Sequence, residues 1–109
     1  MQNLEQLQKD VPILKTTVDL YEEFYEYLKA FPKKDQYMLG KHCEGQIIIF
    51  LDYILTAVGL PKEHKHKYLL RASNKLDVLT VFIRIAWKLK MLDEKRYLSL
   101  QLKIEEIGR

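Results

Sequence analysis

Three histidines and one cysteine are the side chains in this sequence best suited to metal binding or nucleophilic catalysis. His42 and Cys43 are adjacent, and His64 and His66 are two residues apart. Side chains one or two positions apart on a helix point in different directions, so neither pair forms a chelate or a Cys–His dyad. A single cysteine also excludes an intramolecular disulfide and a multi-cysteine metal site. We therefore expect Cys43 in the core, no metal and no cofactor.

Motifs for acid–base chemistry or phosphate binding are not found either. Helical ribonucleases of the HEPN class carry an arginine followed a few residues later by a histidine, whereas all three histidines here precede Arg71, the first arginine. Asp52 and Asp77 are lone acids within helical patterns, typical of a surface or an interface. The sequence has no Gly-rich phosphate loop and no Cys-x-x-Cys pair. It therefore predicts a protein that is not an enzyme, with no catalytic residue.

The basic side chains in the second half of the chain are suited to binding a polyanion. The candidate nucleic-acid-binding residues are Lys67, Arg71, Lys75, Arg84, Lys88 and Lys90. The first three are spaced four residues apart, and Arg84 and Lys88 continue the series about two turns later. Such a strip can follow a phosphate backbone without base specificity.

The charge of the chain is unevenly distributed along its length. The formal net charge is +3, but residues 1–58 carry 6 lysines and 9 acids, whereas residues 59–109 carry 12 Lys and Arg and 6 acids. A basic half favours a polyanionic partner, although charged side chains often only cover a solvated face. Tyr68 and Tyr97 are candidates for stacking on bases, but the core or an interface is the more common place for such residues.

Periodic apolar residues predict the helices that position these side chains. The expected helices cover residues 12–31, 36–58, 62–92 and 94–107. Pro12 suits a first helical turn, and Asp35 and Asp93 are expected N-caps. Gly59-Leu-Pro61 is expected to end the second helix with a C′ glycine. Four amphipathic helices with short turns predict one all-α domain over residues 1–109, an up-down-up-down four-helix bundle.

The third predicted helix is apolar on two faces. One face is expected to join the core and carries Leu69, Leu76, Leu79, Ile83 and Trp87. The other carries Val78, Val81, Phe82, Ile85 and Leu89. A surface helix of a small domain needs only one apolar stripe. We therefore expect the second face to contact another copy of the chain.

The remaining features concern localisation and a second interaction surface. The longest unbroken apolar run covers residues 47–51, far short of a membrane span, and no signal peptide is visible after Met1. We expect a cytoplasmic protein without a membrane partner. The first helix has an acidic face that contains Glu22 and Glu26. This face is either solvated or a docking surface for a basic partner.

Several short segments, taken in order, carry a family resemblance. They are Val11-Pro-Ile-Leu-Lys15 with Asp19-Leu20, Lys29-Ala-Phe-Pro-Lys33, Tyr37-Met-Leu-Gly40, Ile54-Leu55, Leu76-Asp77 with Leu79, and Ile104-x-x-Ile107-Gly108-Arg109. This order resembles the accessory variability determinant (Avd) proteins of diversity-generating retroelements. That family shares a broader four-helix-bundle group with the proteins encoded in 23S rRNA intervening sequences. The resemblance covers nearly the whole chain.

The resemblance implies a ring-shaped homo-oligomer, a homopentamer of four-helix bundles with a basic surface. It also implies a non-catalytic partner of the element's reverse transcriptase that binds template RNA or an RNA/DNA hybrid during error-prone cDNA synthesis. The basic positions that carry over are Arg71, Lys75, Arg84 and Lys88. Two alternatives are a stand-alone relative of the intervening-sequence proteins and a helical protein–protein interaction module that uses the acidic first helix.

Overall fold

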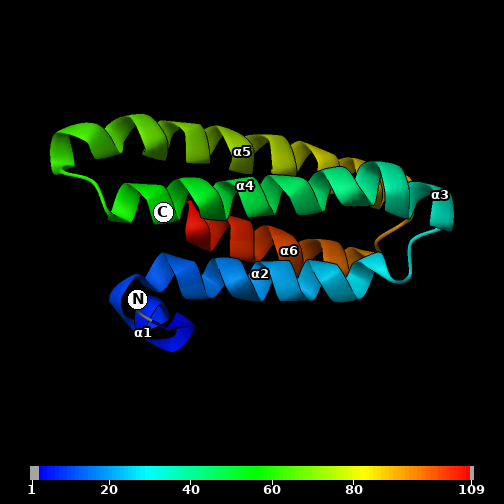
Figure 1. The fold of residues 1–109 in the computed structure, drawn as a ribbon. Helices are drawn as coiled ribbons and strands as arrows, with labels where there is room; N and C mark the ends of the chain where they lie inside the picture. The colour runs from blue at the N-terminus through cyan, green and yellow to red at the C-terminus, as the bar shows by residue number, and fades with distance from the viewer. Residues whose placement is uncertain (1–2, 109) are drawn as a thin grey trace.

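The computed structural model describes residues 3–108, which are all-helical and compatible with a helical bundle (Figure 1). The elements in order are α1 (Leu4–Asp10), α2 (Pro12–Leu28), α3 (Lys33–Asp35), the π-helical turn η1 (Gln36–Gly40), α4 (Lys41–Val58), α5 (Lys62–Lys88) and α6 (Glu94–Ile107). The bundle is elongated, with extents of 43 × 26 × 23 Å.

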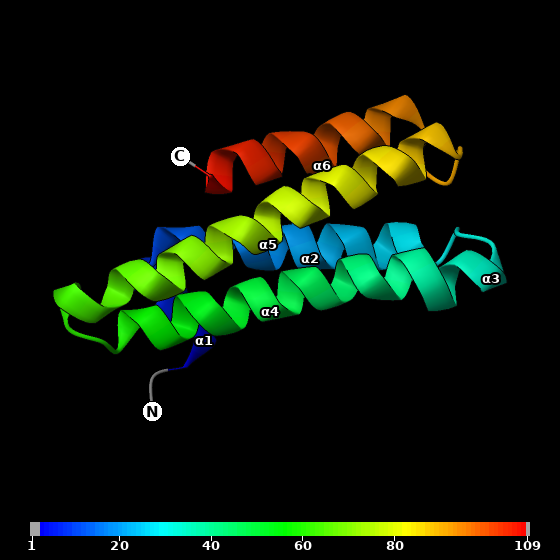
Figure 2. The ribbon, with the colours of Figure 1, turned by 90° about the horizontal axis from the view of Figure 1, so that it is seen from above.

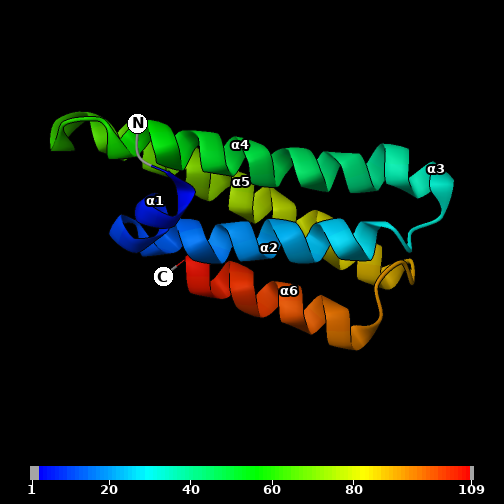
Figure 3. The same ribbon diagram turned by 60° about the horizontal axis from the view of Figure 1, so that its bottom comes forward.

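The helices α4 and α5 form the most extensive contact in the described part of the chain. They are antiparallel, because His42 meets Phe82 near one end while Tyr53 meets Tyr68 near the other. Their connection projects beyond the ends of α2 and α6 (Figure 2). At the opposite end, the α2–α3 and α5–α6 connections lie together (Figure 3). The bundle therefore has one end formed by α4 and α5 alone and one end to which all the long helices contribute.

The core lies between the four long helices and draws on each of them. Its fully buried large side chains include Leu20 and Phe24 of α2, Ile47 of α4, Leu79 and Ile83 of α5, and Leu100 of α6. Phe24 packs edge-on against Phe31, with ring centroids 6.0 Å apart. These positions recur every three or four residues, as expected for helices that each bury one stripe.

Three leucines of α5 and α6 are exposed, and one of them, Leu69, was expected on the core face of its helix. Leu69 is 47% exposed, Leu98 51% and Leu102 66%. Leu69 is near the start of α5, the end at which its connection to α4 projects beyond α2 and α6 (Figure 2). Leu98 and Leu102 lie four residues apart on the side of α6 away from the core.

The start of α2 follows the prediction, whereas its end does not. Pro12 occupies the first helical position. The helix ends at Leu28 and not near Phe31, because Lys29, Ala30 and Phe31 donate backbone hydrogen bonds only three residues back. Pro32 disfavours helical geometry at the residue before it, but the regular α-helix ends about one turn before that residue.

The prediction that Asp35 caps the second helix is wrong. The chain is already helical from Lys33, with Pro32 at the N-cap, and Asp35 lies within that first turn. The π-helical turn η1 follows before regular α-helix resumes at Lys41. The side chain of Gln36 turns back and donates to the Phe31 carbonyl at 2.8 Å. This bond links the end of the α2 segment to the start of the next helix.

Two glycines within this segment have different surroundings. A Cβ added at Gly40 would overlap Cδ1 of Leu28 and lie 3.2 Å from the Asp35 carbonyl oxygen, whereas a Cβ at Gly45 would meet nothing within 4 Å. Gly40 therefore permits a close approach to α2, and Gly45 does not serve that purpose.

Alanine substitutions at the two glycines should have opposite effects. Gly45→Ala should stabilise the fold by about 1 kcal/mol, because alanine favours helix over glycine by that amount. Gly40→Ala gains the same propensity but forces Leu28 and the π-helical turn to shift, which costs roughly 1–3 kcal/mol. Urea unfolding of both variants measures the difference. Equal stabilisation by both would contradict the close contact at Gly40.

The third long helix ends four residues earlier than predicted, at Lys88 and not Leu92. Lys90 adopts a φ of 65°, and its N–H bonds the Trp87 carbonyl at 3.0 Å while the N–H of Met91 bonds the Ala86 carbonyl at 2.9 Å. This bond pair is a Schellman motif, which usually has glycine at the left-handed position. By contrast, Gly59 ends α4 as predicted but with a φ of −86°, so it is not a left-handed C′ glycine.

Candidate nucleic-acid and subunit interfaces

The cysteine and histidines do not form a reactive site in the described residues. Cys43 is fully buried, and burial raises the pKa of its thiol to about 12. The ring of His42 lies 4.5 Å from that of Phe82, on the α5 side of α4. Among residues 3–108, no group of three or more His, Cys, Asp and Glu side chains is placed to hold a metal ion. These observations leave Cys43 as a core residue.

The first group of predicted basic residues lies near the α4 side of α5. Lys67 and Arg71 both lie over the ring of Tyr68, at 5.3 and 5.6 Å from its centroid. Tyr68 in turn lies 6.4 Å from Tyr53 of α4. Lys75 follows one turn later and is half-buried. This end of α5 therefore presents cations supported by two tyrosine rings.

The second group lies near the α6 side of the same helix. Arg84 donates through Nε to the Tyr97 hydroxyl at 3.4 Å, and this bond helps to lower the pKa of Tyr97. Lys88 is one turn further on and is exposed, as is Lys90 after the helix. Nine residues separate Lys75 from Arg84, which at 100° per residue is half a turn out of phase. The predicted basic strip is therefore two separate groups on different sides of α5.

The predicted subunit interface is exposed in part. Val81, Ile85 and Leu89 are 56%, 36% and 63% exposed. Val78 and Phe82 are partly buried, and Phe82 packs against the core. Ile48 and Ile49 of α4 are also exposed, at 49% and 38%. The α4–α5 pair thus presents more apolar surface than a single stripe requires.

The acidic face of α2 is largely neutralised by neighbouring cations. Asp19 pairs with Lys15 at 3.4 Å and Glu26 with Lys29 at 3.1 Å. Glu23 binds Lys103 of α6 and accepts a hydrogen bond from the Tyr27 hydroxyl at 2.6 Å. Burial acts to raise the pKa of Glu23, but these hydrogen bonds outweigh it and leave the pKa below its ordinary value. This pattern favours a solvated face that also joins α2 to α6.

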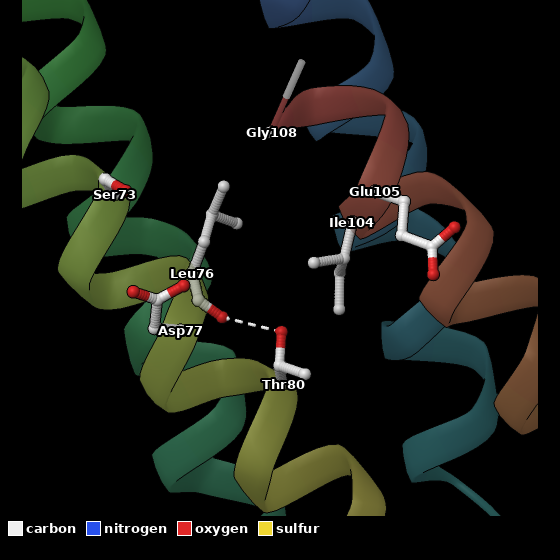
Figure 4. A pocket seen from close by; sticks show the side chains of 7 residues that line it. All are labelled: Ser73, Leu76, Asp77, Thr80, Ile104, Glu105 and Gly108. Atoms are coloured by element: carbon white, nitrogen blue, oxygen red, sulfur yellow. Dashed lines mark hydrogen bonds between the residues drawn. The ribbon is translucent and has the colours of Figure 1, made fainter.

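A cavity of about 470 Å³ lies where α5 and α6 diverge (Figure 4). Its lining residues are Ser73, Leu76, Asp77, Thr80, Ile104, Glu105 and Gly108. The Thr80 hydroxyl is occupied by a hydrogen bond to the Leu76 carbonyl at 2.9 Å. The lining has two carboxylates and no basic side chain, so this cavity does not suit a phosphate.

Comparison with known families decides where the chain belongs. A family model described as bAvd-like matches residues 11–109. The chain belongs to the bAvd-like family. The match begins next to the first residue of α2 and includes both candidate surfaces, whereas α1 precedes it.

No curated protein matches this bAvd-like chain. None of the helices within residues 3–108 combines the length and apolar character that a membrane crossing requires. The terminal Ile-Gly-Arg segment of the resemblance includes Arg109, which lies outside the described residues.

Proposed function

We propose that this bAvd-like chain is the cytoplasmic, non-catalytic accessory protein of a diversity-generating retroelement. In this role it binds the element's reverse transcriptase together with template RNA or an RNA/DNA hybrid, and it supports mutagenic cDNA synthesis. The observation that carries the proposal is family membership over residues 11–109, because that family is an accessory protein family. The basic surface and the unpartnered apolar stripe of α5 are consistent with this role.

The proposed assembly is a homopentameric ring of up-down-up-down four-helix bundles. The exposed stripe of Val81, Ile85 and Leu89 supplies apolar surface for contacts between copies. A ring repeats the basic side chains of α5 around its circumference. Multivalent contact then compensates for weak single contacts with a polyanion.

Light scattering on a sizing column tests the proposal, first with the protein alone and then with its reverse transcriptase and a structured RNA. We expect a mass near five subunits, a further increase with each partner, and release of the RNA at high salt. A reverse transcriptase from an unrelated retroelement is the matched control. A monomer that elutes unchanged with both partners would refute the accessory role.

A further inference from the structure

The connection between α5 and α6 combines an unusual backbone with a positive side chain. Lys90 occupies the left-handed position of the Schellman motif with a φ of 65°. Residues other than glycine rarely adopt this region, and where they do a functional reason is often found. The lysine is exposed and lines a cavity of about 550 Å³. The motif thus places a cation at a position where stability alone favours glycine.

An aromatic ring forms part of the same cavity. The indole of Trp87 stacks on the Tyr97 ring, with centroids 4.5 Å apart and planes 7° apart. Tyr97 is itself fixed by hydrogen bonds from Arg84 and Gln101. Trp87 packs against the core but is only partly buried, and it is one of the residues that line the cavity. Stacking on Tyr97 therefore fixes the orientation of an indole whose residue remains partly exposed.

Positive side chains outnumber acids in the stretch of sequence that contains the lining residues of this cavity. Residues 84–96 contain five Lys and Arg against two acids, while the rest of the chain contains thirteen of each. The two acids, Asp93 and Glu94, line the cavity together with Leu92. Asp93 is already engaged as the N-cap of α6, where it accepts from the Arg96 N–H at 2.8 Å. The lining itself carries two lysines and two carboxylates, and the positive excess of this stretch comes from Arg84, Lys95 and Arg96 beside it.

The neighbouring connection at this end adds further cations. The α2–α3 turn, with Lys33 and Lys34, lies at the same end of the bundle (Figures 1 and 3). The guanidinium of Arg96 lies over the Tyr27 ring of α2 at 5.1 Å, which joins the two connections. A flexible polyanion bound at this end of the bundle can thus reach cations of both connections.

We propose that this end of the bundle binds an unpaired nucleotide of a single-stranded nucleic acid. The base stacks on the indole of Trp87, and Lys88 and Lys90 contact the flanking phosphates. An aromatic platform beside a basic surface is the usual way to hold a single strand, and stacking tolerates any base. Paired bases in a duplex are stacked on each other and do not reach the ring. The inference rests on the proposed nucleic-acid role and names the place of contact.

Fluorescence tests the site directly, because Trp87 is the only tryptophan in the sequence. The probes are oligoadenylate and oligouridylate of twelve nucleotides, as RNA and as DNA, and the corresponding duplexes. Single strands of either sugar should quench the emission in a saturable way, and duplexes should quench it weakly. Saturable quenching that is equal for single strands and duplexes would contradict stacking.

Two variants separate the ring from the charge. Trp87→Leu should weaken binding of the single strands about tenfold, measured by anisotropy of a labelled oligonucleotide. Lys90→Gly should weaken it several-fold while raising the unfolding midpoint by about 4 °C, since glycine relieves the left-handed strain. Lys62→Gln, at the opposite end of the bundle, removes the same charge and should leave binding unchanged.

The outcomes distinguish this site from the wider role. If wild type and both variants bind the single strands equally and the emission does not change, the site is wrong while nucleic-acid binding by the protein stands. If wild type binds no single strand or structured RNA by anisotropy at low salt, the nucleic-acid part of the proposed function fails as well.

Discussion

Replacing Val81 and Ile85 together by aspartate should convert the protein from an oligomer into monomers. Both side chains project from the exposed stripe of α5, at 56% and 36% exposure, and neither belongs to the buried core. In a monomer the new carboxylates remain in water, so the fold should be retained. Between subunits each would be desolvated without a partner, at roughly 2 kcal/mol or more apiece. Light scattering measures the mass, and circular dichroism verifies the helices.

A matched control lies on α6. Like Val81 and Ile85, Leu98 and Leu102 are exposed apolar residues one helical turn apart, at 51% and 66% exposure. Their replacement by aspartate changes charge and surface in the same way, but on a helix outside the predicted interface. We expect that variant to keep the mass of the wild type. Dissociation by the α6 pair and not by the α5 pair would move the interface to α6.

The sequence predicted those helix ends that depend on a distinctive residue. Pro12 begins α2, and Asp93 caps α6 by accepting from the Arg96 N–H at 2.8 Å. Gly59 marks the end of α4. Proline, a capping carboxylate and glycine each act through local geometry, so a single sequence reveals them.

The ends that were missed depend on tertiary packing. Lys90 carries no sign of a left-handed conformation, and the Schellman bonds that hold it are seen only in the structure. The π-helical turn at Gln36–Gly40 likewise inserts an extra residue without a compositional signal. Apolar periodicity assumes an unbroken helix, so it extended one helix to 92. Asp35 suits an N-cap by residue type as well as Asp93 does, but the chain is already helical from Lys33.

The candidate site was predicted residue by residue but not in its arrangement. The basic side chains were treated as one strip because their spacing along the chain looked regular. The half-turn between Lys75 and Arg84 places them on different sides of α5. Trp87 was assigned to the core, since a mostly apolar helix gives no indication of which aromatic borders a cavity. The structure shows that Trp87 does pack against the core but is only partly buried and also lines a cavity.

Neutralising the two basic groups of α5 separately should produce large and additive losses of RNA affinity. One variant replaces Lys67, Arg71 and Lys75 by glutamine, and the other replaces Arg84, Lys88 and Lys90. Each phosphate contact contributes about 0.7 to the salt slope for a single strand and about 0.9 for a duplex. Loss of three contacts in each subunit of a ring should lower affinity by roughly a hundredfold or more. Anisotropy titrations between 50 and 200 mM salt, the range over which such contacts weaken steeply, measure both quantities.

A third variant controls for net charge alone, with Lys9, Lys15 and Lys41 replaced by glutamine on α1, α2 and α4. It should change the salt slope little, because these lysines lie outside both groups. Two surfaces that contact RNA independently should give logarithmic losses that add in the combined variant. A single shared contact path would instead make the combined loss smaller than the sum. If each triple variant binds as the control does, the α5 cations serve only to solvate the helix.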